Sequence, residues 1–329
     1  MENISNLVKD VICPVPALYK DDLTIDLKAM SRHLDFLLSK EVPVLYLAQA
    51  ASEWEWMTRE ERIDITKLVV SGIQKSSNKK TVLMAQPIGK TNIIDHIEEA
   101  RMLEGLGVDV LVIAPIPIKL GGQFFSGSFN RGGYQRERHD SYYSRYMEKF
   151  AHSVNTPICF HNFPPAPGKS LAFETLEEIT NIPLVVGIKE HNKELATRKE
   201  VYSRFGDKVL CFEGFAKEDF FWAIQYGAKA RHSNWSWFDP EWDIRFSKNL
   251  HAKDYRTVIG MIKAETEFGK VITETGYAGY KAVLEAEGFQ GGLVRIPGLN
   301  ISLEEKREVA MAWKKHKEIR EEIIARSSF

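Results

Sequence analysis

Short runs of apolar, often β-branched residues recur through the first 240 residues, and segments with helical periodicity lie between them. The candidate strands are residues 11–15, 42–48, 81–86, 108–114, 157–162, 184–190, 209–214 and 229–234. Most runs are continuous rather than alternating, which is typical of parallel strands buried on both faces. Helices are predicted between them, for example at 26–38, 92–106 and 140–154, with candidate N-caps at Thr24, Thr58 and Thr91.

Eight strands that alternate with helices predict an α/β fold, the (β/α)8 TIM barrel. An open doubly wound sheet is the competing architecture. Its nucleotide-binding versions carry G-x-G-x-x-G after the first strand or G-x-x-x-x-G-K-[ST], and we find neither. We therefore expect residues 1–250 to form a barrel.

Beyond residue 250 the strand-like runs stop, and the sequence becomes helical at 255–268, 279–287 and 303–327. We expect residues 251–329 to form a C-terminal helical extension that packs on the barrel or on a neighbouring subunit. Residues 118–140 carry no regular pattern, and loops of this length often act as lids or binding loops. Because this segment follows the fourth strand, it is expected over the C-terminal mouth, where active sites of such barrels form.

Composition and charge argue against several classes of function and predict where the protein is located. The 329 residues include 44 Lys+Arg and 45 Asp+Glu, a net charge of -1, so we expect no binding to nucleic acid or to an anionic membrane. The sequence has no apolar run of about 18 residues and no basic, apolar leader, so neither a membrane span nor a signal peptide is expected. Cys13, Cys159 and Cys211 are far apart and form no C-x-x-C, which suits a reducing compartment and predicts a cytoplasmic protein.

Lys189 lies at the close of the sixth run, L-V-V-G-I-K-E. In one interpretation the strand has ended and the lysine is a solvated loop residue. In the other it points into the barrel, where loss of hydration lowers the pKa of the amine and makes it nucleophilic toward a carbonyl. Alternation places Val185, Gly187 and Lys189 on one face, so Gly187 is expected to leave space beneath the amine.

His161 closes the preceding strand, in P-I-C-F-H-N-F-P. Neighbouring strands would bring it beside Lys189, where a neutral imidazole can relay protons to a carbonyl–amine adduct. The alternative is a structural histidine that bonds to backbone at a strand end. If His161 is the relay, activity is expected to fall as the pH drops through roughly 6 to 7, where an ordinary imidazole gains its proton.

Four motifs occur in a characteristic order: S-E-W-E-W-M-T-R-E-E-R at 52–62, F-H-N-F-P at 160–164 before Pro167-Gly168, G-I-K-E at 187–190, and G-A-K-A-R-H-S at 227–233. From about residue 10 to about residue 300, the chain resembles the dihydrodipicolinate synthase / N-acetylneuraminate lyase superfamily of Schiff-base-forming class I aldolases. The resemblance implies that Lys189 is the imine lysine. It also implies that His161 occupies the position of the family's tyrosine.

The sequence departs from the family's G-T-T-G-E motif, because residues 49–53 read Q-A-A-S-E. The two threonines, whose hydroxyls join the family's proton relay, are thus replaced by alanine. The resemblance implies that the backbone N–H groups of this loop can still hold a substrate carboxylate. The candidate substrate-binding residues are Gln49, Ala50, Ala51 and Ser52.

Two further departures concern the substrate. The tyrosine that the family has after its fourth strand falls on Pro117, and the arginine that the synthase uses for its second substrate falls on Ala166. Both imply a substrate different from that of dihydrodipicolinate synthase and a role outside lysine biosynthesis.

Arg231 and His232 lie in the eighth strand, where alternation requires one of them to point into the barrel. A buried arginine needs a carboxylate partner, which could be Glu53, Glu213 or the substrate. Both residues are therefore candidates for substrate binding, with an internal salt bridge as the alternative. Four tryptophans flank the second and eighth strands: Trp54, Trp56, Trp235 and Trp237. They indicate either an aromatic wall that favours a bulky substrate or a subunit interface.

The resemblance implies a lyase of the aldolase type that acts on a 2-oxo acid such as pyruvate or a 2-keto-3-deoxy sugar acid. Its catalytic residues would be Lys189 and His161, with no cofactor. No metal is expected, since no ligand spacing such as H-E-x-x-H occurs. A homo-oligomer, dimer or tetramer, is common in this family. The alternatives are a 2-keto-3-deoxy sugar-acid dehydratase and a non-catalytic ligand-binding descendant.

Overall fold

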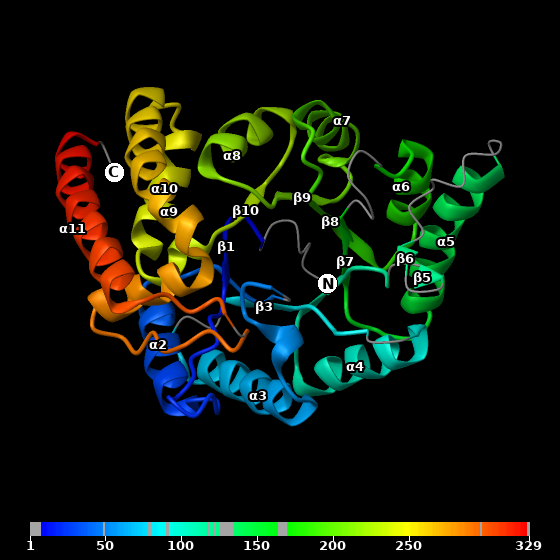
Figure 1. Cartoon of the computed structure of the whole chain (residues 1–329). Coiled ribbons are helices and arrows are strands. Elements are labelled where there is room, and N and C mark those ends of the chain that lie inside the picture. The colour runs from blue at the N-terminus through cyan, green and yellow to red at the C-terminus, as the bar shows by residue number, and fades with distance from the viewer. Residues whose placement is uncertain are drawn as a thin grey trace. The chain divides into compact units, whose positions relative to one another are not determined.

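The computed structural model describes residues 8–48, 50–77, 80–89, 92–116, 119–120, 123–124, 134–163, 170–296 and 298–327. Its main strands are β1 Asp10–Pro14, β2 Val44–Leu47, β3 Val82–Ala85, β4 Val110–Ile113, β7 Ile158–Asn162, β8 Val185–Glu190, β9 Leu210–Glu213 and β10 Ala230–His232. They form a closed barrel in the order β1-β10-β9-β8-β7-β4-β3-β2 (Figure 1). The predicted TIM barrel is confirmed, and each of the eight predicted runs overlaps one of its strands, although β1 begins one residue before its run.

Burial explains why the strands read as continuous apolar runs. Every residue of β2, β3, β4 and β9 is buried, so neither face of these strands requires polar side chains. Charged or polar residues occupy the C-terminal ends of β7, β8, β9 and β10. Such groups are costly to bury without partners, which draws attention to this end of the barrel.

Helices alternate with the strands as the sequence predicts. They are α2 Leu27–Ser39, α3 Arg59–Lys75, α4 Ile93–Leu106, α5 Tyr134–Ala151, α6 Phe173–Thr180, α7 Leu195–Phe205, α8 Lys217–Ala223 and α9 Pro240–His251. The Thr58 cap is confirmed, since its side chain accepts from the backbone of Glu61 in a capping box. The Thr24 cap is wrong: α2 begins after Asp26, which accepts from Ala29 N, while Thr24 Oγ1 donates to Asp22 in the preceding turn.

The segment 118–140 is more regular than its sequence indicates. β5 Lys119–Leu120 and β6 Gln123–Phe124 pair as a short antiparallel hairpin, and α5 already begins at Tyr134. The predicted irregular loop is therefore wrong for residues 134–140. Its charged, polar sequence lacks the apolar periodicity by which helices are recognised.

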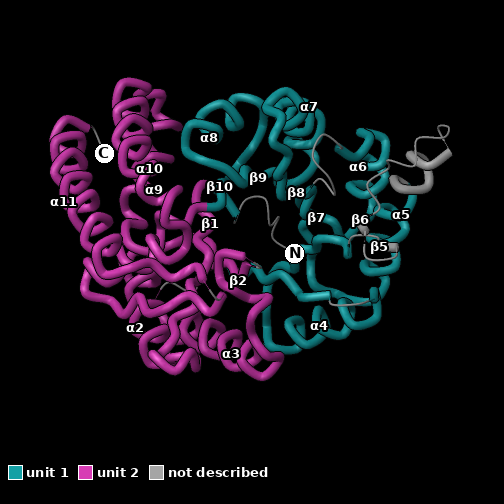
Figure 2. Tube along the Cα trace, viewed as in Figure 1, with its two compact units in different colours: residues 1–9, 82–232 teal, residues 10–81, 233–329 magenta. Residues whose placement is uncertain are grey.

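The chain forms two compact units (Figure 2). The first comprises residues 1–9 and 82–232, and the second comprises residues 10–81 and 233–329. The first unit contains β3, β4, β7 to β10 and the helices α4 to α8. The second contains β1, β2, α2, α3 and the helices after β10. The predicted boundary between a barrel at 1–250 and a helical region at 251–329 remains a prediction.

The C-terminal part of the second unit is helical, as expected. α10 Tyr255–Ala286 and α11 Leu303–Arg326 lie side by side (Figure 1). The two helices predicted at 255–268 and 279–287 are continuous in α10, apart from Gly276, whose φ of 57° and ψ of -145° interrupt the helical geometry. Among the described residues, none of the helices combines the length and apolar character needed to cross a membrane.

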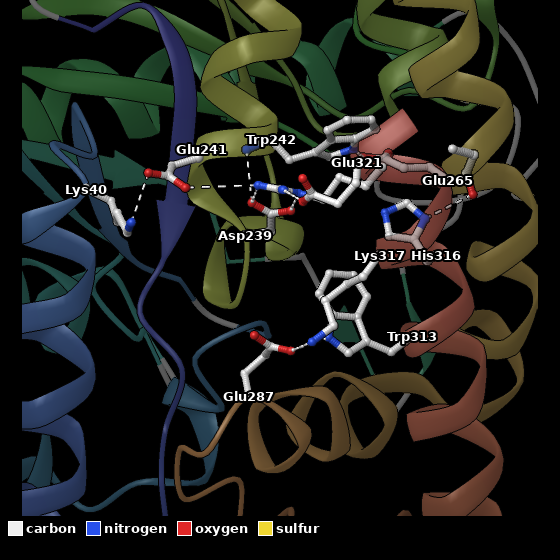
Figure 3. A network of polar contacts seen from close by, with 12 residues as sticks. Lys40, Asp239, Glu241, Trp242, Glu265, Glu287, Trp313, His316, Lys317 and Glu321 are labelled. Atoms are coloured by element: carbon white, nitrogen blue, oxygen red, sulfur yellow. Dashed lines mark hydrogen bonds and ion pairs between the residues drawn. The ribbon is translucent and has the colours of Figure 1, made fainter. Parts of the chain in front are cut away.

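Polar contacts hold α11 against the rest of its unit (Figure 3). Glu287 accepts from Trp313 Nε1 at 2.7 Å and from Lys317 Nζ at 2.6 Å. Arg320 Nη2 donates to Asp239, the N-cap of α9, at 3.1 Å. Trp313 is also buried among aromatic rings. Together these contacts explain why α11 packs stably although its sequence is heavily charged.

Candidate active site

Lys189 is a buried lysine near the end of β8, with 5% of its surface exposed. Its register partners are His161 on β7 and Phe212 on β9. Loss of hydration among these strands lowers the pKa of the amine from 10.5 to about 7. Lys189 is therefore not a solvated loop residue, and a substantial fraction of its amine is neutral near pH 7.

Gly187 does not leave the predicted space beneath the amine. A Cβ atom at this position would lie 2.7 Å from Cys159 Sγ and 2.8 Å from the Leu210 carbonyl oxygen. Neighbouring strands thus fill the volume that a side chain would need. Glycine is required here because β7 and β9 approach β8 closely, which alternation along a single strand does not reveal.

His161 is buried on β7, directly opposite Lys189. Its Nε2 lies 3.3 Å from Nδ1 of His191, and the two rings stack with their centroids 5.6 Å apart and an angle of 21° between their planes. Nδ1 of His161 has no hydrogen-bond partner among the described residues. The alternative in which this ring bonds to backbone is therefore not what the structure contains.

His191 belongs to the same cluster, although the sequence analysis did not single it out. It follows β8, and its backbone N–H donates to the Asn162 carbonyl at 3.1 Å. Its ring packs edge-on against Phe163 and Phe215, with centroids 5.2 and 4.9 Å away. Continuing the alternation of β8 by two residues beyond Lys189 would have pointed to His191.

Burial keeps the histidines of this cluster uncharged. Loss of hydration lowers the pKa of His161 and of His232 well below 6.5, and that of His191 to about 4. The positive charge of Lys189 acts in the same direction on all three. The expectation that His161 titrates between pH 6 and 7 is therefore wrong, and the group that titrates near this range is Lys189.

Arg231 and His232 are both on β10. His232 lies close enough to Lys189 and His191 for their charges to influence its pKa, which places it with the histidine cluster. Strand alternation then directs the buried Arg231 to the other face. Its register partner Glu213 already has other partners: Tyr202 Oη donates to it at 3.0 Å, and Arg198 Nε lies 3.3 Å from it.

Glu190 and Glu213 are register partners that alternate with Lys189 and Phe212 along β8 and β9. Both carboxylates are buried, and loss of hydration raises the pKa of each to about 7. Glu190 accepts from Asn162 Nδ2 and from the Asn192 backbone, each at 2.7 Å. These bonds tie together the ends of β7 and β8, which carry His161 and Lys189.

The turn at residues 50–53 lies in the second unit. Ser52 is buried, and its hydrogen-bonding groups serve the turn: its backbone N–H donates to the Ala48 carbonyl at 3.1 Å, and its hydroxyl accepts from Ala48 N at 3.1 Å. Ala51 is also buried, whereas Ala50 is exposed. Ser52 is thus a poorer candidate for the substrate carboxylate than the backbone of the two alanines.

Glu53 ends this turn in the left-handed region, with φ at 51°. Its carboxylate lies 2.5 Å from Lys281 Nζ and accepts the Arg295 backbone N–H at 2.7 Å. Glu53 and Lys281 are both almost completely buried, so each neutralises a charge that would otherwise be costly. The ion pair fixes the C-terminal side of the turn.

The four tryptophans do not form an exposed aromatic wall. Trp54, Trp235 and Trp237 are buried, whereas Trp56 is 48% exposed. Trp235 packs against Phe268, and Trp237 against Tyr277 and Tyr280, both from α10. Most of this aromatic surface therefore stabilises the packing of the C-terminal helices.

Some residues singled out in the sequence lie outside the described part of the chain. They are Gln49, Thr91, Pro117, Ala166, Pro167 and Gly168. Among the described residues, no group of three His, Cys, Asp or Glu side chains is arranged to hold a metal ion.

Comparisons with known proteins agree with this architecture. The sequence matches the Dihydrodipicolinate synthetase family over residues 133–316, more than half of the chain. It is 22% identical to 4-hydroxy-tetrahydrodipicolinate synthase of Chloroherpeton thalassium, over 60% of this chain and 58% of that protein. It is 26% identical to the probable 2-dehydro-3-deoxy-D-pentonate aldolase of Escherichia coli, over 55% of this chain and 53% of that protein. The chain thus spans a little over half the length of these two relatives.

A solved structure extends the likeness over the whole barrel. N-acetylneuraminate lyase from Fusobacterium nucleatum superposes with a TM-score of 0.80 at 17% identity, covering 94% of this chain and 99% of that one. At this identity, the likeness shows the fold alone.

Proposed function

The chain belongs to the dihydrodipicolinate synthetase family, and on this premise we propose that it is a lyase that forms a Schiff base between Lys189 and a 2-oxo acid. The observation that carries the proposal is the burial of Lys189 at the end of β8, which lowers the pKa of its amine to about 7. A lysine that is partly neutral at physiological pH can attack a carbonyl, whereas an ordinary surface lysine is almost fully protonated.

In the proposed reaction, the Lys189 amine attacks the C2 carbonyl, and loss of water gives an imine. The protonated imine accepts the electron pair of the breaking bond, which permits loss of an aldehyde or of a β-hydroxyl group without a metal. His161 transfers protons to and from the substrate, since it is the register partner of Lys189 and stays neutral at pH 7. His232 is the next candidate for this role.

For the substrate, we propose pyruvate or a 2-keto-3-deoxy sugar acid. The printed function of the E. coli relative, a probable 2-dehydro-3-deoxy-D-pentonate aldolase, supports this class. We further propose that the backbone N–H groups of Ala50 and Ala51 receive the substrate carboxylate. The substitutions at Ala50, Ala51 and Ala166 argue against the two-substrate reaction of lysine biosynthesis.

Borohydride trapping tests the proposal. The protein is incubated with pyruvate and a panel of 2-keto-3-deoxy sugar acids, reduced, and weighed by intact-mass spectrometry. We expect one reduced adduct on the wild type and none on Lys189→Ala. Lys193→Ala is the matched control, since this exposed lysine lies only four residues away, and it should label like the wild type.

The outcomes separate the competing functions. An adduct followed by release of an aldehyde supports an aldolase, and one followed by loss of water alone supports a sugar-acid dehydratase. If no 2-oxo acid in the panel gives an adduct, the chain is better explained as a non-catalytic ligand-binding descendant.

A further inference from the structure

The contact between His161 and His191 is an imidazole–imidazole hydrogen bond, in which one ring must donate and the other accept. The 3.3 Å separation joins Nε2 of His161 to Nδ1 of His191. The remaining nitrogen of His161, Nδ1, is buried and has no hydrogen-bond partner among the described residues. A buried polar atom without a hydrogen-bond partner is unfavourable, so this nitrogen is a natural position for a polar group of the substrate.

We infer that His191 is the positioning residue for His161: its Nδ1 accepts the Nε2 proton of His161 and leaves Nδ1 of His161 as the base that meets the substrate hydroxyl. The inference rests on the proposed function for the identity of the substrate. The hydrogen bond and the resulting tautomer of His161 are properties of the free protein.

The proton transfer can be written for the aldol cleavage of the imine. Nδ1 of His161 uses its lone pair to take the proton of the substrate hydroxyl. The electrons of the broken O–H bond form the carbonyl of the leaving aldehyde, and those of the broken carbon–carbon bond move into the protonated imine to give an enamine. His161 is then an imidazolium whose Nε2 proton still points at His191, which stabilises the new charge.

The surroundings keep His191 neutral, which leaves its Nδ1 able to accept a hydrogen bond. The positively charged groups that face it are Lys189 from β8 and Arg198 from α7, and with burial they lower the pKa of His191 to about 4. His161 is faced by Lys189, His191 and His232. Phe163 and Phe215 pack edge-on against the His191 ring and fix its plane, so the acceptor has a defined direction.

Two substitutions separate the hydrogen bond from ring packing. His191→Phe keeps an aromatic ring between Phe163 and Phe215 but has no acceptor. His191→Asn loses the ring but places an amide oxygen close to the position of Nδ1. If His191 acts through its hydrogen bond, activity is lost in His191→Phe and restored in His191→Asn. If it acts through ring packing, His191→Phe is the more active of the two variants.

The test combines the tautomer of His161 with kinetics on the full-length protein. ¹⁵N NMR of histidine-labelled protein reports which nitrogen carries the proton, with His161→Phe as the assignment control. We expect the Nε2–H tautomer of His161 in the wild type and in His191→Asn, and a changed tautomer population in His191→Phe. An Nδ1–H tautomer in the wild type overturns the inference, whether or not Lys189 forms an adduct.

For turnover, we expect His191→Phe to lower kcat by about tenfold or more, a part of the ~100-fold or larger contribution of a positioned acid–base group. KM and the trapping of Lys189 should stay close to wild type, and His191→Asn should recover most of the loss. Wild-type kcat in His191→Phe, or a lower kcat in Asn than in Phe, overturns the inference. Failure of the wild type to trap any 2-oxo acid counts instead against the proposed function.

Discussion

His161 on β7 and Lys189 on β8 are register partners, so a buried imidazole and a buried amine stand opposite each other at the ends of adjacent strands. Burial lowers the pKa of both groups, and the positive charge of Lys189 lowers that of His161 further. The pair therefore combines a neutral nucleophile with a neutral base at physiological pH, a combination that requires burial because exposed lysines are protonated under the same conditions.

The rate of imine formation should follow the ionisation of Lys189. Because the pKa of its amine is lowered to about 7, the amine is protonated and unreactive below this pH and neutral above it. We expect the trapping rate to rise with pH through a single ionisation near 7 and then to level off. The midpoint should stay near 7 in His161→Phe, since His161 titrates at lower pH. A midpoint near 10, the ordinary value for lysine, would contradict this account.

Replacement of His161 should separate imine formation from bond cleavage. In His161→Phe, we expect borohydride trapping to continue while the bond-breaking step slows by ~100-fold or more, the usual scale for losing a positioned acid–base group. Single-turnover kinetics with the true substrate measures this step. His152, an exposed histidine after α5, provides the control variant His152→Phe. Near-wild-type cleavage by His161→Phe would assign the proton relay elsewhere, with His232 the next candidate.

The register that brings these two residues together could be predicted from the sequence. Continuous apolar runs marked every strand, and the motifs around His161 and Lys189 placed both residues at strand ends. His191 was missed because it lies just past β8, where a run of apolar residues no longer identifies the strand face. Gly187 was misinterpreted because the space beside it depends on Cys159 and Leu210 from neighbouring strands.

The N-termini of the helices also depend on contacts that the sequence alone does not reveal. Thr58 satisfies the cap of α3 as predicted, because its partner Glu61 stands three residues later in the sequence. Thr24 and Asp26 are both good caps by residue type, and the turn that joins Thr24 to Asp22 decides between them. The pKa of His161 could not be predicted from the sequence either, since it depends on burial and on Lys189 as a neighbour.

Replacing one partner of the buried Glu53–Lys281 ion pair should destabilise the protein much more than replacing both partners. Lys281→Met leaves the Glu53 carboxylate buried without its partner cation, and we expect the free energy of unfolding to fall by roughly 3–5 kcal/mol. The double variant Glu53→Gln/Lys281→Met leaves no unpaired buried charge, so it should recover most of this loss. Urea denaturation of the two variants and the wild type measures the difference. Equal stability of the single and double variants would contradict the prediction.

The homo-oligomer predicted from the sequence remains a prediction. Trp54 no longer supports it, since this side chain is buried within the subunit, whereas Trp56 keeps a large exposed apolar surface. Light scattering at micromolar concentration should give the mass of a dimer or tetramer. A stable mass of 37.6 kDa, that of one chain, would refute the prediction.

The central claim is that Lys189 forms the imine, and the most direct test locates the adduct within the chain. Wild-type protein is reduced with borohydride in the presence of the 2-oxo acid that labels it best, digested, and sequenced by tandem mass spectrometry. We predict that the reduced adduct lies on Lys189 alone and leaves Lys217 and Lys281, the other lysines buried among the described residues, unmodified. An adduct on a different lysine, or equal labelling of Lys189→Ala, would contradict the account.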